Sequence, residues 1–382
     1  MNKVLKTSLG MILIGVILVA IGFFSGGRVS SILLTKEGVK IYDTDKSKNI
    51  VKKSFDLDKF NKINISSYLD LNYIQIVKGG GYKLELQYDE KNKINYSVKD
   101  GILKINNTSE EEKAIQFGIF YNNPEQGIKL YIPEDCNLDE LKIYTSSSDV
   151  KITEVNCKNI DINNEYGDVQ LSNIFCEDMV LKVESGDLDL ANIKGNKISL
   201  EDDYGSAEIK DVNSEELSCI VNSGDFIGEN INISQNYNIE NYYGDVDIKK
   251  SDFGDFKATL SSGDLNGNNI NISQNCDIKS DYGDIIMENA SLGNFTANLD
   301  DGDIELSDII SIKDVDIKNS YGDVELSTKL DKNSFNYYLE CEDGYGTIDF
   351  NDKEYEGNYN QDNKAKYTIN ITTESGDIDL EF

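Results

Sequence analysis

Apolar and polar residues alternate in short runs on both sides of a glycine that recurs from Thr145 to the C-terminus. Counted from each glycine as position 0, the apolar positions are −7, −5 and often −3 before it, and +2, +4 and +7 after it. Alternation with period two indicates β-strands that bury one side. Each unit is therefore predicted to contain two short strands joined by corners. Around Gly186 the apolar positions are Met179, Leu181, Val183, Leu188, Leu190 and Ile193.

The glycines return every 19 or 20 residues, which is the spacing of a repeat protein whose units cover one another's apolar faces. We therefore predict an all-β fold, a parallel β-solenoid with coils of about 19–20 residues. Glycine suits a corner because it adopts positive φ without strain. After Gly322 the interval lengthens, first to Gly346 and then to Gly376, which predicts insertions in the last two coils. The regular corner glycines are Gly167, Gly186, Gly205, Gly224, Gly244, Gly263, Gly283, Gly302 and Gly322.

The residue before the glycine alternates between tyrosine and serine or aspartate from coil to coil. Position −3 is small or polar when position −1 is tyrosine, and aliphatic when it is not. If both positions face the core, a large residue in one is matched by a small residue in the other, so we predict that the tyrosines are structural and buried. An exposed stripe that binds sugars is the alternative. The tyrosine row comprises Tyr166, Tyr204, Tyr243, Tyr282 and Tyr321.

An aspartate follows most of the corner glycines and forms the most prominent candidate site. Stacked carboxylates about 4.8 Å apart repel one another, so backbone N–H groups or bound cations must relieve them. We favour hydrogen-bonded structural turns, and a Ca²⁺ site is the alternative because Ca²⁺ prefers oxygen ligands. The row is interrupted at Ser206 and Thr347. Its cation candidates are Asp168, Asp187, Asp225, Asp245, Asp264, Asp284, Asp303 and Asp323, and Asp149 and Asp377 lie at its ends.

Residues 7–24 form an apolar run behind Lys3 and Lys6 that is long enough to span a bilayer. A signal-peptide core is usually shorter and ends in an A-x-A-like site, whereas this run ends in Gly22-Phe-Phe-Ser-Gly-Gly27, so we predict an uncleaved transmembrane signal anchor over residues 1–27. The two lysines place the amino terminus in the cytoplasm and the remaining chain outside. The expected location is thus the cell membrane, with a single pass and an extracytoplasmic body.

Three further segments follow the anchor. Residues 28–57 mix Lys and Asp with little periodicity and are predicted to be a polar tether. Residues 58–127 show strand alternation and are predicted to form an N-terminal β cap with the first strands, which shields the open end of the sheet. Residues 128–382 are predicted to form the solenoid array with atypical C-terminal coils.

Composition excludes several functions. The chain has 69 acidic and 37 basic residues, a net charge of −32, so we expect no nucleic-acid partner and an attraction to cations or basic partners. Histidine is absent, which excludes a Ser-His-Asp triad and a His-ligated metal. Arg28 is the only arginine. No catalytic residue or cofactor is predicted. A polysaccharide-active enzyme on a β-helix remains the alternative, although it needs an irregular cleft that the regular coils do not supply.

Six cysteines are present, and most occupy apolar positions of the repeat. Cys219, Cys276 and Cys341 are predicted to be small buried residues in coils too far apart to bond. Cys157 and Cys176 are expected to stack in adjacent coils at about 4.8 Å, within disulfide range. The sequence leaves open whether these two are bonded.

Three motifs together resemble a known family: Phe-x-x-Ile-x-Ile from Phe60, the Ser-Gly-Asp and Tyr-Gly-Asp coils, and the ending from Ile369 to Ile378. The chain resembles the bacterial putative-adhesin family of β-strand-repeat proteins, a domain of unknown function, over about residues 58–382. The resemblance implies a membrane-anchored envelope protein without established catalytic residues. The expected function is a non-enzymatic binding or scaffold module with a cationic, cell-wall glycan or protein partner. The alternatives are the β-helix enzyme and a Ca²⁺-dependent surface structural protein.

Overall fold

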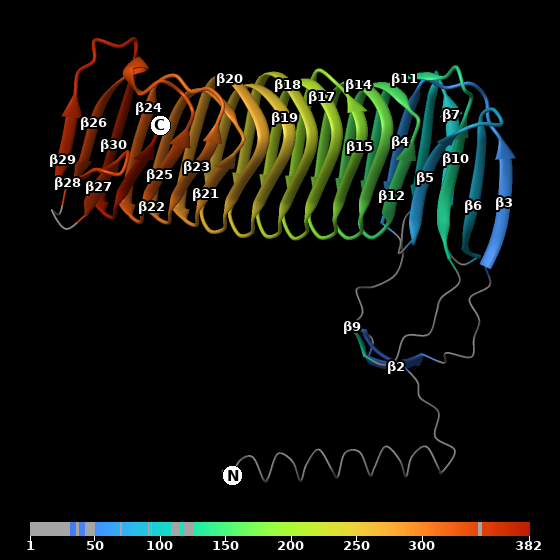
Figure 1. The fold of residues 1–382 in the computed structure, drawn as a ribbon. Helices are drawn as coiled ribbons and strands as arrows, with labels where there is room; N and C mark the ends of the chain where they lie inside the picture. The colour runs from blue at the N-terminus through green and yellow to red at the C-terminus, as the bar shows by residue number, and fades with distance from the viewer. Residues whose placement is uncertain are drawn as a thin grey trace, which may run out of the picture.

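The computed structural model describes residues 31–35, 38–42, 50–68, 71–90, 92, 94–107, 115–117, 125–342 and 346–382. Most of them form one long rod of stacked parallel coils (Figure 1). Parallel pairing places residues one repeat apart side by side, as Leu188 lies beside Ala207 and Ala207 beside Phe226. The predicted parallel β-solenoid is therefore confirmed.

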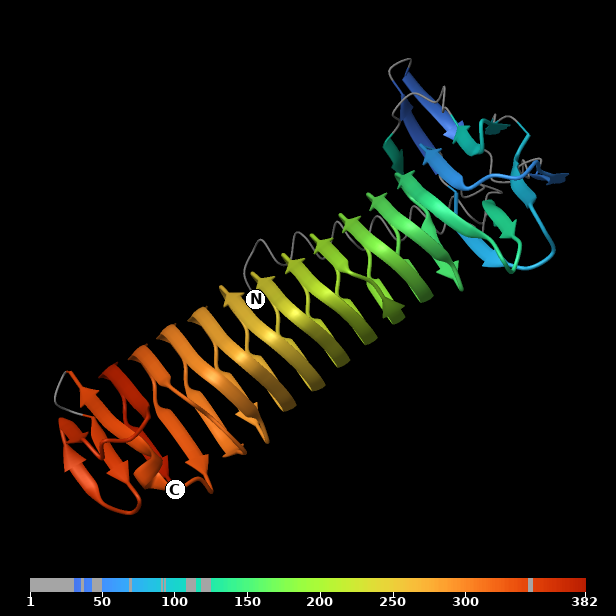
Figure 2. The same cartoon turned by 90° about the horizontal axis from the view of Figure 1, so that it is seen from above.

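Each coil contributes to two faces of the rod, which Figure 2 shows from above as parallel rows of strands. The post-glycine face contains the segments that follow the corner glycines. It consists of β5 (Tyr73–Lys78), β12 (Asp149–Thr153), the first parts of β14 (Val169–Val183), β17 (Ala207–Val221), β18 (Phe226–Asn241), β19 (Val246–Leu260) and β20 (Leu265–Tyr282), and β15 (Leu188–Lys194), β21 (Ile285–Glu288), β23 (Ile304–Ile309), β25 (Val324–Thr328), β31 (Ile378–Glu381) and β27 (Thr347–Phe350).

The pre-glycine face contains the segments that precede the glycines. Five strands of the central coils continue from one face to the other, so two separate strands per coil occur only in the other coils. The face consists of β4 (Lys62–Ser67), β11 (Asn137–Thr145), β13 (Asn156–Asn164), β16 (Lys197–Asp202), the second parts of β14, β17, β18, β19 and β20, and β22 (Ser291–Asp301), β24 (Val315–Tyr321), β30 (Tyr367–Ser375) and β26 (Phe335–Cys341).

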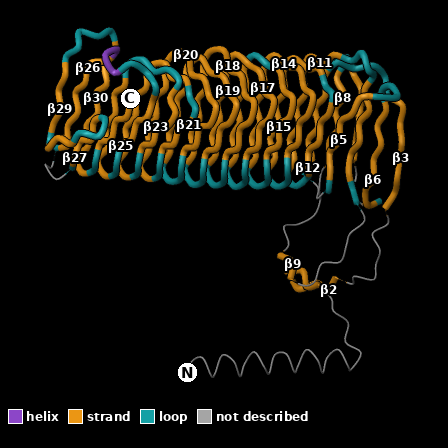
Figure 3. The backbone as a smooth tube through the Cα atoms, in the orientation of Figure 1, coloured by secondary structure: helices purple, strands orange, loops and turns teal. Residues whose placement is uncertain are grey.

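The core lies between the two faces and follows the predicted periodicity. In β14 the buried residues are those at positions +2, +4 and +7 of one coil and −7, −5 and −3 of the next. Burying these aliphatic side chains on both faces of every coil supplies the main stabilisation of the rod. The corner turns align along one long edge of the rod (Figure 3), which we name the turn edge and define as positions −2 to +1 around each corner glycine.

The N-terminal end of the rod is closed by antiparallel strands, and it begins earlier than predicted. β4 and β5 already pair in parallel with β11 and β12, so the first coil lies within the segment predicted as a cap. Outside this coil lie β8 (Ile102–Asn107) and β10 (Gly127–Ile132), followed by antiparallel β7 (Ile94–Lys99) and β6 (Lys83–Asp89).

The last strand at this end, β3 (Ile50–Asp56), pairs antiparallel with β6. Residues 50–56 therefore belong to the sheet, and the prediction of a tether is wrong for them. The lysines at positions 52 and 53 interrupt the alternation and conceal the strand, whereas Val51 and Phe55 still pack against the core. The antiparallel strands cover the open end of the solenoid, where unpaired parallel edges would otherwise favour association.

At the C-terminal end the coils do not stack in chain order. β30 and β31 pair with β24 and β25 on one side, and with β26 and β27 on the other. The coil of Gly376 therefore follows that of Gly322 in space, and the coil of Gly346 comes last. Antiparallel β28 (Glu354–Glu356) and β29 (Asn358–Gln361) close this end, and a short 3₁₀ helix, η1 (Lys332–Ser334), precedes β26. The sequence had predicted insertions but not this order.

A separate small sheet contains β1 (Ser31–Thr35), β2 (Gly38–Tyr42) and β9 (Ile115–Phe117), which pair antiparallel. Two of its strands fall within residues 28–57, so the segment that was predicted to be a polar tether contains strands as well. In the part of the chain that the structure describes, no helix is both long and apolar enough to cross a membrane. The predicted anchor over residues 1–27, with its span at 7–24, lies outside the described residues.

Candidate binding surface along the turn edge

Backbone packs directly against backbone at the corner glycines. At Gly244, φ is +139° and a Cβ atom would lie 2.1 Å from the carbonyl oxygen of Gly224 in the preceding coil. At Gly263 the corresponding φ is +126° and the distance to the Gly244 carbonyl oxygen is 2.0 Å. No side chain fits in this space, and the torsion itself disfavours one. Glycine thus sets both the turn and the close stacking of the coils.

The aspartate row is engaged with the backbone. In each case Oδ1 accepts a hydrogen bond from the backbone N–H of the residue at the same position in the next coil, as Asp264 N donates to Asp245 Oδ1 over 3.0 Å. Ser206 continues the row through its hydroxyl, to which Asp225 N donates over 3.3 Å. This bonding offsets the repulsion between stacked carboxylates. The other bonds of the row join Asp149 to Asp168, Asp168 to Asp187, Asp187 to Ser206, Asp225 to Asp245, Asp264 to Asp284, Asp284 to Asp303, Asp303 to Asp323, and Asp323 to Asp377.

At the C-terminal end, the aspartate row follows the order in which the coils stack in space rather than their order in the chain. Thr347 N and Thr347 Oγ1 both donate to Asp377 Oδ1, over 2.7 and 3.0 Å. Among the described residues, no group of three or more His, Cys, Asp or Glu side chains is arranged to hold a metal ion. The arrangement is a set of hydrogen-bonded turns, which is the role that the sequence favoured for these aspartates.

The tyrosine row lies on the surface, so the prediction that it fills the core is wrong. The side chains of these five tyrosines are between 60% and 69% exposed. In three of the Tyr coils the strand ends at position −3, and in the coils of Tyr282 and Tyr321 the tyrosine is its last residue, so the alternation of burial has ended at position −1. Position −1 therefore points to solvent, although position −3 in the same coil is buried. The members are Tyr166 61%, Tyr204 69%, Tyr243 67%, Tyr282 61% and Tyr321 60%.

Position −3 explains why the coils alternate. We name the coils with tyrosine at position −1 Tyr coils, and those between them, with serine or aspartate there, Ser coils. In the Tyr coils, the buried Asn241 Nδ2 donates to the carbonyl oxygen of Gly224 over 3.0 Å, and Asn319 Nδ2 donates to that of Gly302 over 2.9 Å. These bonds are partly buried, and a carbonyl that has limited access to water needs such a donor. The amide thus bonds the glycine of the preceding Ser coil, a contact that the packing interpretation of this position missed.

Two Tyr coils have no asparagine at this position. In the coil of Tyr282, Ser280 Oγ donates to the carbonyl oxygen of Tyr282 over 3.3 Å, and in the coil of Tyr204 the residue is Asp202. Its side chain is 1% exposed, and both carboxyl oxygens are buried without a hydrogen-bond partner. Burial away from water, reinforced by Asp187 and Asp203, raises the pKa of Asp202 to about 7. A protonated Asp202 would regain a donor, as the neutral amide of asparagine has at this position.

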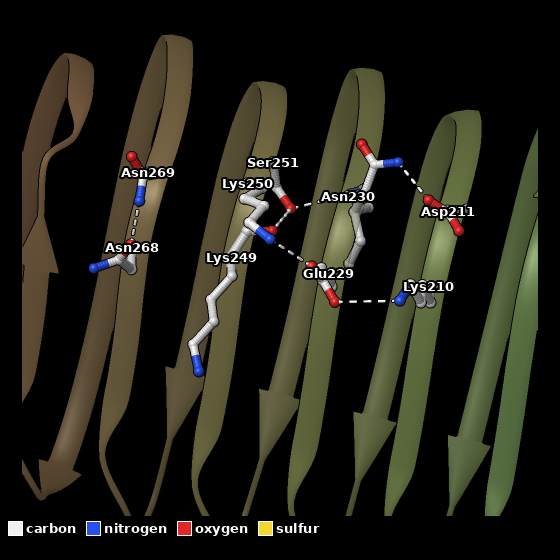
Figure 4. Close-up of polar contacts among 10 residues, drawn as sticks. Lys210, Asp211, Glu229, Asn230, Lys249, Lys250, Ser251, Asn268 and Asn269 are labelled. Atoms are coloured by element: carbon white, nitrogen blue, oxygen red, sulfur yellow. Dashed lines mark hydrogen bonds and ion pairs between the residues drawn. The ribbon is translucent and has the colours of Figure 1, made fainter.

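A second polar ladder lies at the other corner of each coil, at position +6. The residues there adopt left-handed backbone conformations, for example φ +56° at Asn230 and +55° at Asp211. Asparagine and aspartate tolerate this conformation best among non-glycine residues. Figure 4 shows Asn230 bonded to Asp211, and Glu229 paired with Lys210 and Lys250 over 3.5 and 2.8 Å. In the sequence, the only sign of this corner is the Asn or Asp that often precedes the apolar position +7.

The cysteines occupy the positions that the repeat register predicts. Cys219, Cys276 and Cys341 are buried in the core. Cys157 lies directly beside Cys176 in the next coil, and both are free thiols. Burial raises the pKa of each of these two thiols to about 12, which disfavours the reactive thiolate.

A rod of glycine-cornered parallel coils with closed ends defines a class of β-solenoid proteins. The chain belongs to the Toastrack DUF4097 family, whose model matches residues 60–252 and 233–381. No curated protein matches the chain.

Several solved structures are similar over most of their length. They include a putative adhesin from Bacteroides fragilis (13% identity, 87% of this chain and 98% of that chain, TM-score 0.27) and a putative cell adhesion protein from Clostridium sporogenes (14%, 87% and 98%, TM-score 0.17). A further one is a putative lipid binding protein from Parabacteroides distasonis (17%, 86% and 96%, TM-score 0.32). The superpositions are poor, so they assign no residue role.

Proposed function

We propose that the protein is a membrane-tethered extracytoplasmic rod that acts as a non-enzymatic binding module of the cell envelope. The observation that carries this proposal is the turn edge, which presents the same exposed side chains at regular intervals on a rigid backbone. A surface of this kind fits a long partner laid along the rod, whereas a small substrate needs an enclosed pocket.

The rigidity of the rod supports a binding role. Every central coil is joined to its neighbours by parallel backbone hydrogen bonds on both faces. The aspartate row adds a side-chain bond to each turn. A surface that is ordered before it meets its partner loses little conformational entropy on binding.

The tether rests on the apolar run at residues 7–24. We expect protease added to intact protoplasts to digest the rod, while residues 1–27 remain in the membrane fraction. Protection of the rod would contradict its orientation, and recovery of the rod in the medium without the anchor would contradict the tether.

The binding function is tested with the full-length protein in detergent and with isolated cell envelopes stripped of protein. We expect saturable retention of the protein on the envelopes, without chemical change to their polysaccharide. Absence of retention would contradict the binding function. Release of reducing sugar ends that increases with protein concentration would instead support the enzyme alternative.

A further inference from the structure

We propose that the tyrosine row is the binding site for a linear, uncharged or amine-bearing glycan that lies along the turn edge. This inference rests on the proposed binding function and names its surface and its ligand. The tyrosine row is the set of five exposed residues Tyr166, Tyr204, Tyr243, Tyr282 and Tyr321.

The rings are available to a ligand. Among the described residues, no ring–ring contact or side-chain hydrogen bond holds these five tyrosines. Alternate coils place a small residue at the same position, such as Ser223 or Ser262, so the fold does not require tyrosine there. Five exposed aromatic side chains lower the solubility of a protein and are typical of a contact surface.

The backbone that carries the rings is also held in place. The carbonyl oxygen of Tyr243 accepts a hydrogen bond from Gly224 N over 2.8 Å, and that of Tyr321 accepts one from Gly302 N over 2.9 Å. Tyr204 and Tyr282 are bonded in the same way to the glycines of their preceding coils. Tyrosine has only two side-chain torsions to fix, so binding through this row carries a small entropic penalty.

The spacing favours a polymer with a repeat of two units. Tyrosine occurs in every second coil, and two strand separations amount to about 9.6 Å. In an extended β-1,4-linked glycan, the sugar that presents the same face returns after each disaccharide, at a similar distance. Successive tyrosines can therefore stack on the same face of successive disaccharides.

The flanking groups complement the hydroxyl edges of a sugar. Beside four of the five tyrosines, an aspartate of the row uses Oδ1 for the backbone bond to the next coil, as Asp245 does with Asp264 N, whereas Ser206 takes this place beside Tyr204. This leaves Oδ2 on the surface to accept a hydrogen bond from a ligand hydroxyl or ammonium group. The apolar face of a pyranose ring packs on the tyrosine, and the hydroxyls reach the carboxylates.

The same geometry disfavours a peptide ligand. A peptide that adds a strand needs free backbone groups at a sheet edge. At the turn edge the backbone N–H groups of Gly244, Asp245 and Val246 already bond to neighbouring coils, and the ends of the rod are closed. Recognition must therefore use side chains. The net charge of −32 also repels polyanions, which leaves neutral or amine-bearing chains.

The test is calorimetric titration of the full-length protein in detergent with chitin and chitosan oligosaccharides of two to ten sugars. We expect affinity to rise with each added disaccharide until all five rings are covered. A triple variant, Tyr204→Ser, Tyr243→Ser and Tyr282→Ser, should bind the decamer at least tenfold more weakly. Its melting temperature should remain that of the wild type, because serine is the residue of the intervening coils.

The matched control is Phe175→Ser with Tyr338→Ser, two exposed aromatic residues outside the row, which should bind like the wild type. Unchanged binding by the triple variant, or affinity independent of oligosaccharide length, would overturn the proposal. Preferential binding of a polygalacturonate or of a proline-rich peptide would overturn the ligand class. If the triple variant still binds stripped envelopes like the wild type, the glycan site is refuted while the binding function survives.

Discussion

The Tyr coils and the Ser coils share one backbone path and differ at two positions. In a Tyr coil the buried position −3 is polar, as at Asn241, and position −1 carries an exposed ring. In a Ser coil position −3 is aliphatic, as at Leu260, and position −1 is small. The difference shows that one corner geometry accommodates either a buried polar residue with an exposed ring or a buried aliphatic residue with a small exposed one.

The largest effect is expected at the corner glycine, which both kinds of coil share. Gly244→Ala in a Tyr coil and Gly263→Ala in a Ser coil should each destabilise the rod by about 3 kcal/mol or more, because the new methyl group would overlap the carbonyl of the preceding coil. Chemical denaturation of each variant measures this. A much smaller cost in one kind of coil would show that the two corners are not equivalent. Gly80→Ala is the control: its φ of +68° also disfavours alanine, but nothing lies within 4 Å of the added atom, so it measures the cost of the torsion without the overlap.

The next largest effect on stability is expected at position −3, where the two kinds of coil differ. Asn241→Val places the aliphatic residue of a Ser coil into a Tyr coil and removes the donor to the Gly224 carbonyl. A partly buried carbonyl left without a partner should cost about 1–3 kcal/mol of the free energy of unfolding. The matched control is Leu260→Val, which changes the same position in a Ser coil where no such bond exists. Equal costs in the two variants would contradict the hydrogen-bond explanation of the alternation.

A pH-dependent effect is expected at Asp202. Its pKa in the folded protein is raised to about 7, above its usual value of 3.8, so the folded state retains a proton that the unfolded state has lost. The contribution of Asp202 to stability is therefore present below about pH 4 and is lost as the pH rises toward 7. Asp202→Asn should stabilise the rod by about 1–2 kcal/mol at pH 8 and change little at pH 4.

Denaturation at the two pH values tests this prediction. Asp281→Asn, an exposed aspartate at position −2 of another Tyr coil, serves as the control. A stabilisation by Asp202→Asn that is the same at both pH values would mean that the carboxyl group is not protonated in the folded protein.

The smallest effect on stability is expected at the exposed position −1. Tyr282→Ser should change the free energy of unfolding by less than about 0.5 kcal/mol, because its ring is exposed and serine occupies this position in neighbouring coils. Thermal denaturation measures it. A loss on the order of 3 kcal/mol, as for the removal of a buried aromatic side chain, would restore the packing interpretation of the tyrosine row.

The sequence by itself determined the repeat, the two faces and the core. The glycine interval, the period-two alternation and the corner residues all reflect interactions within one coil or between equivalent positions of adjacent coils, so they recur in the chain as a pattern. The same register placed Cys219 and Cys276 in the core and Cys157 beside Cys176. The family resemblance was visible for the same reason.

Only the tertiary structure decided where the regular pattern stops. The orientation of Tyr282 depends on the point at which the strand becomes a turn, a shift that reverses which side a residue faces. The role of Asn241 depends on a carbonyl in the preceding coil. The positions of β3 and of the Gly376 coil depend on pairing between segments far apart in the sequence, which leaves no local periodicity. Such pairing is selected by closure of the open ends of the sheet, a property of the whole rod.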